Sequence, residues 1–179
     1  KDGPGISQSC VFSADMQNNL DLKIIATAGD TSGLSNPPQY PGRFSMNAGG
    51  GVVAESGQLN WNYGQWYYVT ICNDGGNIQF YRDGNPITSY QWNSALLNNR
   101  QFNSLNLGVS SEFTGNINNW SPIPQFGFDG LLDDMCYFNI ALSQSEIQEY
   151  MNCPPPTFEP GLIGYWNFEE GQDTIAYDQ

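Results

Sequence analysis

Histidine is absent from this 179-residue sequence, and bases are scarce, since five Lys and Arg residues stand against 18 Asp and Glu residues. Without histidine, the Ser-His-Asp and Cys-His arrangements of nucleophilic catalysis and the usual zinc sites are excluded. The net charge of −13 argues against nucleic acid, whose phosphates need Lys and Arg, and against an anionic membrane surface. The excess acid suits a calcium-rich or saline exterior, or simply a solvated surface.

Long apolar runs are also lacking, because none approaches the roughly 20 residues of a membrane span. No signal peptide is visible and the chain begins at Lys1 without Met, so we expect a mature or excised piece of a protein. The length suits one domain with a sizeable core. Aromatic residues make up 14% of the chain, charged residues only 13%, and Gly, Asn and Ser are abundant, which predicts an all-β domain with many turns.

Short apolar alternations between turn signals predict the strands. GRFSMNAGGGVVAE predicts two short strands joined by a Gly-rich turn. The clearest hairpins lie over residues 66–72 and 77–90, where Asn-Asp-Gly-Gly at 73–76 forms one turn and Asp83-Gly84 forms a second, tight turn. A further strand is expected over LLDDMCYFN.

Only one helix is predicted. Ser143 and Glu146 form a capping box, so the helix should run from about residue 144 to 151. It should end before the prolines of segment 154–161, which predict a stiff linker. Beyond the linker, residues 162–179 begin a new strand unit.

Two adjacent acids, Asp133 and Asp134, fall inside the expected strand LLDDMCYFN. Successive side chains of a strand point to opposite faces, so these carboxylates should not converge on one bond as a glycosidase pair must. A core-facing Asp133 needs a hydrogen-bond partner or a metal ion. Backbone hydrogen bonding, calcium ligation and plain exposure all remain open for Asp133.

Four cysteines are present and none belongs to a CxxC pair. With no histidine available, a zinc site is disfavoured. The alternatives are two disulfides of an exported protein, which allow three connectivities, or four buried free thiols.

The ordered series GQWYYVTI, FYRDGNPI, LNLG and GLLDDMCYFNIALSQSEI resembles laminin-G-like domains. These are antiparallel jelly-roll β-sandwiches of the concanavalin A-like superfamily, close to the pentraxins. The resemblance spans about residues 10–150 and implies such a sandwich, with one short C-terminal helix. Residues 1–153 would form the domain and 154–161 the linker. The segment GLIGYWNFEEGQDTIAYDQ resembles the opening strands of domains in secreted multidomain bacterial surface proteins with repeated domains.

The resemblance leaves two interpretations of residues 162–179. In such jelly rolls the first and last strands lie side by side, so segment 162–170 would pair with 131–138 and close the sandwich in permuted order. Alternatively, 162–179 is the opening strand of a further repeat and forms a flexible tail here.

The same resemblance suggests a disulfide pairing. In pentraxins a disulfide joins an early strand to the strand before the Asp-Gly hairpin, and Cys10 and Cys72 fall at these places. This leaves Cys136 and Cys153 as the second implied pair.

Calcium ligands are also implied by the resemblance. Pentraxins use an Asp-Asn pair after an early strand, where this chain has Asp30 followed by Thr31, and an acid-rich loop, where it has Glu112. Ser110 stands where the family has a glutamate, which puts a two-calcium site in doubt. The alternatives are one weaker calcium at Asp30 and Glu112, or two loop acids that face water.

Sugar recognition needs aromatic faces beside amide and carboxylate groups. Trp92 and Trp120 lie in Asn-rich, loop-like surroundings, and Asn118 and Asn119 supply amides nearby. Packing of either tryptophan beneath a loop is the alternative. Trp66 and Tyr68, by contrast, fall in an alternating strand and are expected in the core.

We therefore expect a non-catalytic module, secreted or at the cell surface, that recognises glycan or mediates adhesion, with calcium as a candidate cofactor. Its partners would be a glycan or cell-surface ligand and neighbouring repeats of the same chain, with no nucleic acid and no membrane span. Superfamily glucanases share a strand motif of the form Glu-x-Asp-x-Glu or Glu-x-Asp-x-x-Glu, which this sequence lacks. The alternative is a structural spacer of a long adhesin or fibre, without its own ligand.

Overall fold

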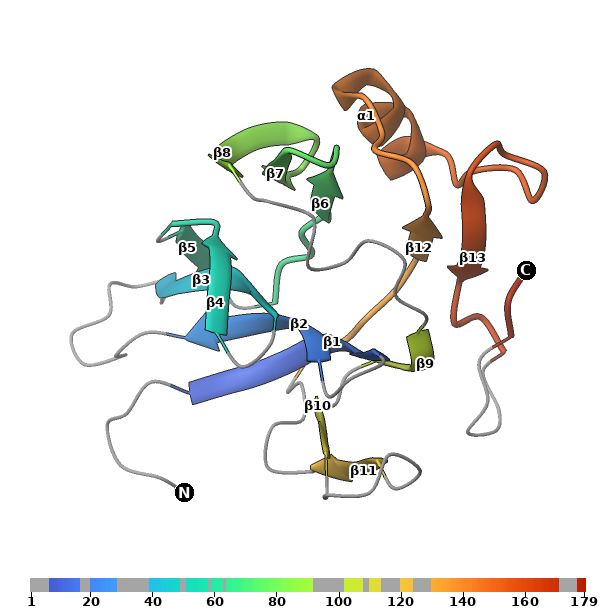
Figure 1. Cartoon of the computed structure of the whole chain (residues 1–179). Coiled ribbons are helices and arrows are strands. Elements are labelled where there is room, and N and C mark those ends of the chain that lie inside the picture. The colour runs from blue at the N-terminus through green and yellow to red at the C-terminus, as the bar shows by residue number, and fades with distance from the viewer. Residues whose placement is uncertain are drawn as a thin grey trace. The chain divides into compact units, whose positions relative to one another are not determined.

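The computed structural model of the chain consists of antiparallel strands and, in the described residues, one short helix (Figure 1). The structure describes the backbone of residues 7–16, 20–28, 39–48, 51–57, 59–62, 64–91, 102–107, 110–113, 120–123, 130–170 and 177–179. Side chains are described for 54–57, 59, 64–91, 130–170 and 177–179. Two compact units are present: the first unit is residues 1–66 and 92–129, and the second unit is residues 67–91 and 130–179.

The first unit contains a six-stranded antiparallel sheet with the order β4-β3-β2-β1-β9, in which β5 also pairs with β3. Two further strands, β10 and β11, pair with each other. The strands run β1 Ser7–Met16, β2 Leu20–Ala28, β3 Gln39–Ala48, β4 Gly51–Glu55, β5 Leu59–Asn62, β9 Phe102–Leu107, β10 Ser110–Phe113 and β11 Trp120–Ile123. The two strands predicted within GRFSMNAGGGVVAE are confirmed as β3 and β4.

The second unit begins with a three-stranded sheet of β6 (Val69–Asn73), β7 (Asn77–Arg82) and β8 (Asn85–Gln91). Both predicted turns are confirmed. In the first, Asp74 Oδ1 accepts hydrogen bonds from the amides of Gly76 at 2.9 Å and Asn77 at 2.7 Å. In the second, Asp83 and Gly84 have φ angles of 51° and 69°, which suit a two-residue hairpin turn.

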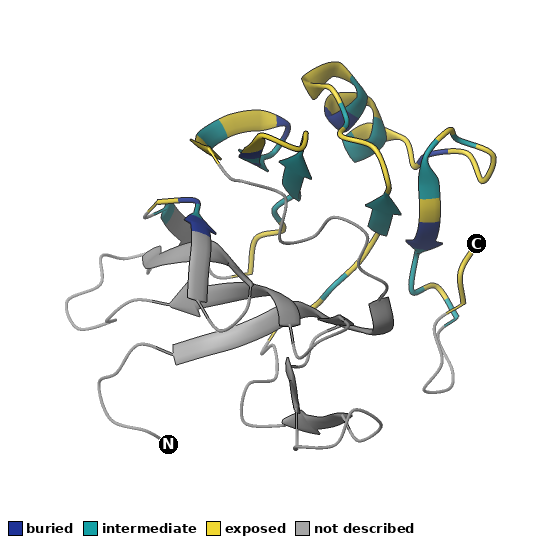
Figure 2. Cartoon of the chain, in the orientation of Figure 1, coloured by how far each residue is buried: buried dark blue, intermediate teal, exposed yellow. Residues whose placement is uncertain are grey.

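The helix α1 spans Gln144–Asn152 and confirms the predicted capping box, because the Ser143 and Glu146 side chains each bond the other's main chain. Its buried residue is Ile147 (Figure 2). The helix contacts the second hairpin turn, since the Nε2 atoms of Gln144 and Gln148 each donate to the Gly84 carbonyl oxygen at 3.1 Å. Ile78, Phe80 and Ile147 are at most 1% exposed and form the core of this unit.

After α1, residues 154–161 turn the chain back into β13 (Leu162–Trp166). Pro155 is buried, and the Glu159 amide donates to the Pro156 carbonyl at 2.9 Å. The Tyr150 hydroxyl is hydrogen-bonded to the Glu159 side chain, which raises the pKa of Tyr150 in addition to the larger effect of burial. These contacts hold the proline-rich segment against α1.

The strand β12 (Met135–Phe138) pairs antiparallel with β13, with Cys136 opposite Tyr165 and Tyr137 opposite Gly164. The pairing expected between segments 131–138 and 162–170 is therefore present. Phe138 also stacks on Tyr150 of α1, with ring centroids 5.7 Å apart. The assignment of 1–153 as one domain and of 162–179 as part of a further repeat stays a prediction.

Candidate functional site

The candidate site that the structure describes in full is the corner before β12, which contains Asp133 and Asp134. The sequence predicted a strand through both residues, but β12 begins only at Met135. Asp134 has a φ of 47°, which a strand does not allow, and Asp133 is exposed. The prediction that the two acids occupy alternating strand positions is therefore wrong. Of the alternatives left open for Asp133, the structure shows exposure together with a hydrogen bond to a backbone amide.

Local hydrogen bonds explain this backbone conformation. The Asp133 Oδ1 atom accepts from the Asp134 amide at 3.0 Å, and the Tyr165 hydroxyl donates to Asp134 Oδ1 at 2.7 Å. Aspartate is among the few residues that adopt positive φ readily. The Asp134 carboxylate is thus hydrogen-bonded to Tyr165 of β13, which lies 31 residues further along the chain.

Two phenols, one buried and one half-buried, interact with the exposed Asp134 carboxylate. Tyr165 is only 8% exposed, and burial together with the Asp134 hydrogen bond raises its pKa well above the usual value of 10.0. Burial raises the pKa of Tyr68 to about 12, with smaller effects from Cys136 and Asp134. Both phenols therefore stay protonated at neutral pH, and Tyr165 acts as a hydrogen-bond donor to the carboxylate.

Three of the four cysteines, Cys72, Cys136 and Cys153, are free thiols in this structure, and the side chain of Cys10 is not described. The pairs Cys10–Cys72 and Cys136–Cys153 stay predictions. The Cys136 Sγ atom lies 3.9 Å from the Asp134 carbonyl oxygen, and the Cys72 Sγ atom lies 3.7 Å from that of Leu142. Cys153 is exposed after the last turn of α1.

A comparison with models of known protein families identifies the fold. Residues 15–148 match the model of the laminin-G-like family described as the concanavalin A-like lectin/glucanases superfamily. The chain belongs to this concanavalin A-like superfamily. Together with the antiparallel sheets and the single helix of the described residues, this match confirms the predicted all-β jelly-roll class.

Other comparisons add little to the superfamily assignment. One similar solved structure is an S-layer domain-containing protein (residues 221–444) from Clostridium thermocellum, with 18% identity and a TM-score of 0.35. The match covers 83% of this chain and 65% of that chain, so this chain spans less than two thirds of its length. No curated protein matches. Within the described residues, no helix combines the length and the apolar character that a membrane crossing requires.

Most of the predicted ligand-binding residues of this superfamily member lie outside the described side chains. Asp30, Trp92, Asn118 and Asn119 lie outside the described residues altogether. For Glu112 and Trp120 only the backbone is described. Strand β10 carries Glu112 and strand β11 carries Trp120, and the register pairs Glu112 with Ser121 and Phe113 with Trp120. The two strands thus bring a predicted metal ligand and a predicted sugar contact to adjacent pairs of the ladder.

Asp133 is the one predicted metal ligand whose side chain is described. Its carboxylate is exposed, and no group of three or more His, Cys, Asp and Glu side chains that could hold a metal occurs among the described residues. Calcium ligation by Asp133 therefore stays a prediction.

The sequence predicted the wrong environment for Trp66 and did not identify Tyr165 as a site residue. Trp66 was expected in the core but is 59% exposed, because residues 65–68 lie before β6 in an irregular segment. No local signal marks Tyr165, whose role follows from the pairing between β12 and β13. The expected pairing of 131–138 with 162–170 was the signal that could have placed Tyr165 beside the two aspartates.

Proposed function

We propose that this chain is a non-catalytic binding module of an exported surface protein and that it recognises extracellular glycans. The observation that carries the proposal is the match of residues 15–148 to the concanavalin A-like superfamily. Secretion or display at the cell surface is part of the proposal, since the ligands of such a module are extracellular.

The corner before β12 supports binding rather than hydrolysis. Glycoside hydrolysis needs two carboxyl groups that flank one bond, one of which acts as a proton donor. Here the Asp134 carboxylate accepts a hydrogen bond from buried Tyr165, and Asp133 bonds the adjacent amide. The Asp134 carboxylate thus bonds β13, and the Asp133 carboxylate bonds the backbone of the corner itself. The sequence also lacks the Glu-x-Asp-x-Glu motif.

The proposed ligand site contains Trp92 and Trp120 as stacking surfaces, with Asn118 and Asn119 as hydrogen-bonding partners. Aromatic rings stack on the C–H faces of sugars, while amide groups fix their orientation. The pairing of β10 with β11 supports this choice, because it brings the Trp120 position close to that of Glu112.

Calcium is the proposed cofactor, with Asp30 and Glu112 as its ligands and Asp133 as a further candidate. Calcium takes six to eight oxygen ligands, and its bound oxygens can include sugar hydroxyls. Asp133 is exposed, which leaves its carboxylate accessible to a cation.

The test is a titration of the chain with the glycan that binds best in a screen, by isothermal calorimetry in calcium and in EDTA. Trp120→Ala and Trp92→Ala should weaken binding about fivefold, because loss of an aromatic stacking contact costs on the order of 1 kcal/mol. Phe158→Ala is the matched control, since Phe158 is 85% exposed in the second unit. Equal loss in all three variants, or release of reducing sugar from β-glucans, would contradict the proposal.

A structural spacer is the second candidate function. It is favoured by the contacts of the proline-rich segment and the chain end, where Pro155 is buried and Asp178 bonds Tyr165. A spacer predicts no glycan binding with or without calcium, so the same titration separates the two functions.

A further inference from the structure

The strand β13 has one edge paired with β12 and a second, outer edge. Tyr165 lies opposite Cys136 of β12, and its main chain also makes two bonds elsewhere. Its amide donates to Asp178 Oδ1 at 2.8 Å, and its carbonyl oxygen accepts from the Gln179 amide at 2.9 Å. In an antiparallel ladder, the N–H and C=O of one residue point to the same side. Residues 177–179, here called the C-terminal segment, therefore occupy the outer edge.

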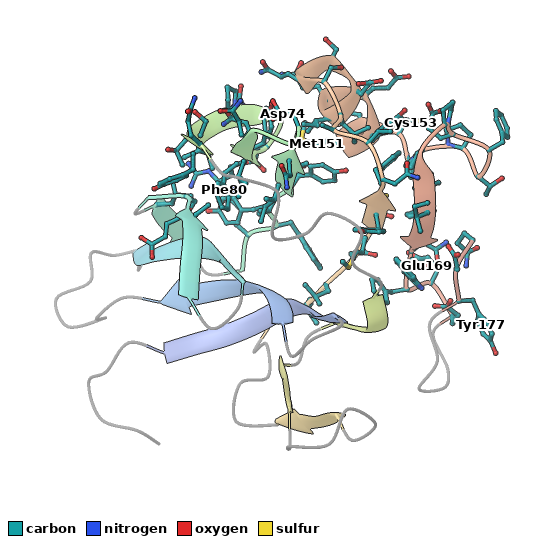
Figure 3. The ribbon with its side chains drawn as sticks, viewed as in Figure 1. Asp74, Phe80, Met151, Cys153, Glu169 and Tyr177 are labelled. Carbon is teal, nitrogen blue, oxygen red and sulfur yellow. The ribbon has the colours of Figure 1, made fainter. Side chains whose placement is uncertain are left out.

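The C-terminal segment imitates a strand only in part. Its third bond joins the Tyr177 amide to Glu170 Oε1 at 2.7 Å, near the end of β13, where Figure 3 shows Tyr177 and Glu169. In two of the three bonds, a side-chain carboxylate takes the place that a main-chain carbonyl holds in a sheet. A full strand would supply both donors and acceptors from its own backbone.

The rest of this edge has the features of a surface for strand pairing. Among the described strands, β13 pairs with β12 alone. Ile163, the second residue of β13, is 54% exposed and offers an apolar side chain to a partner. An edge of this kind is a template for pairing with another chain.

Charge indicates which chain would pair there. The second unit holds eleven of the 18 acids but only one of the five bases, Arg82, which lies over the Tyr67 ring at 5.7 Å. Three acids lie near the outer edge. Glu169 and Glu170 follow β13 in the sequence, and Glu170 accepts from the Tyr177 amide. Asp178 accepts from the Tyr165 amide. A second copy of this chain would bring like charges together, whereas Lys and Arg side chains would be attracted.

We propose that the outer edge of β13 is a docking site for an extended polypeptide strand that carries Lys or Arg and displaces the C-terminal segment. The added strand extends the β12–β13 sheet through main-chain hydrogen bonds, and its basic side chains pair with the surrounding carboxylates. This inference goes beyond glycan binding and does not depend on it.

The test uses a capped, fluorescent peptide of alternating Thr, Val and Lys residues, with affinity measured by anisotropy in EDTA. The full chain should bind the peptide, and deletion of 177–179 should tighten binding at least about tenfold, since the peptide then competes with no internal hydrogen bonds. Amide NMR shifts on binding should centre on residues 162–166. N-methylation of alternate peptide amides, or replacement of Lys by Glu, should abolish binding.

Two variants separate hydrogen bonding from charge. Asp178→Ala removes the acceptor for the Tyr165 amide, so it should tighten peptide binding as the deletion does. This variant still tests the proposal if the deleted chain folds poorly. Asp74→Asn removes one carboxylate from the exposed first hairpin turn and should leave peptide affinity unchanged.

Results of three kinds would overturn the proposal. The first is equal affinity for the Lys and Glu peptides, or no binding by the full chain, the deleted chain and Asp178→Ala. The second is a set of NMR shifts centred away from β13. The third is self-association of the deleted chain without peptide, which would make a second copy the occupant.

Discussion

Tyr165 and Asp134 form a long-range hydrogen bond at a residue with an unusual backbone conformation. Asp134 takes a positive φ, and its carboxylate accepts from a phenol that is nearly fully buried. Removal of one partner from such a bond leaves the other to be solvated again. The pair should therefore stabilise the junction between β12 and β13.

Tyr165→Phe should lower the free energy of unfolding by about 1–2 kcal/mol, because the hydroxyl bond to the carboxylate is lost while the ring still packs. Urea denaturation followed by fluorescence measures this change. Tyr177→Phe is the control, since Tyr177 is 58% exposed, and it should change stability by less than about 0.5 kcal/mol. Equal stability of the Tyr165 variant and the wild type would show that the bond contributes nothing.

Alkaline pH should destabilise the protein through the same phenols. The pKa of Tyr68 is raised from 10.0 to about 12, chiefly by burial, and that of Tyr165 is raised as well. A raised pKa in the folded state favours the protonated form, so its contribution is full below pH 10 and is lost as the pH rises through the folded pKa. Thermal unfolding between about pH 9 and about pH 12 should show this decline, with a smaller slope in Tyr165→Phe. An equal slope in both proteins would contradict this role for Tyr165.

The thiols should differ in their reaction with an alkylating reagent. Burial, with a smaller effect of Asp134, raises the pKa of Cys136 from 9.0 to about 11, whereas Cys153 is exposed. Because the thiolate is the reactive form, Cys153 should be labelled rapidly and Cys136 slowly at neutral pH. Mass spectrometry after timed labelling measures this, and Cys153→Ser should lose the fast phase. Absence of a fast phase before reduction would instead indicate the disulfide Cys136–Cys153.

At the scale of elements, the hairpins and the helix were predictable because their signals are local. Asp83-Gly84 suits positive φ at both positions, and Ser143 with Glu146 forms a complete cap. The start of β12 was not predictable from its own residues, because Asp134 leaves the strand conformation to meet Tyr165. The composition of segment 154–161 predicts a stiff linker. The hydrogen bond between Tyr150 and Glu159, which holds this segment against α1, could not be predicted from that composition. The positions of most proposed ligand residues remain predictions.

Gly84 of the β7–β8 turn contacts α1, because its carbonyl oxygen accepts from Gln144 and Gln148. A Cβ atom there would lie 2.6 Å from Gln148 Cγ, and the φ of 69° is strained for alanine. Gly84→Ala should therefore lower the free energy of unfolding by about 1–3 kcal/mol, measured by urea denaturation. Gly75→Ala is the matched control, because its φ of 94° is also positive but nothing lies within 4 Å. Similar losses in both variants would show that backbone strain alone, and not the helix contact, sets the cost.

At the scale of the whole molecule, the excess of acid favours cationic partners. The chain has a net charge of −13, and the second unit carries most of the acids. Calcium and basic polypeptides both lower the repulsion among these carboxylates. The superfamily match is the other observation at this scale, and it is the basis of the proposed binding role.

Calcium should raise the thermal unfolding midpoint in a saturable way, because a ligand that binds only the folded state stabilises it. At about one hundred times the dissociation constant the gain is about 2.7 kcal/mol, a rise of several degrees for a domain of this size. Asp30→Asn with Glu112→Gln should abolish the rise, whereas Asp74→Asn should not. A midpoint that is the same in calcium and in EDTA would exclude the calcium site.

The most direct test of the central claim is a glycan array probed with the intact chain, in parallel in calcium and in EDTA. A non-catalytic glycan-binding module predicts reproducible binding to one structural class of glycan, with no shortening of the bound sugars. Absence of binding in both conditions, or cleavage of the bound glycan, would contradict the claim.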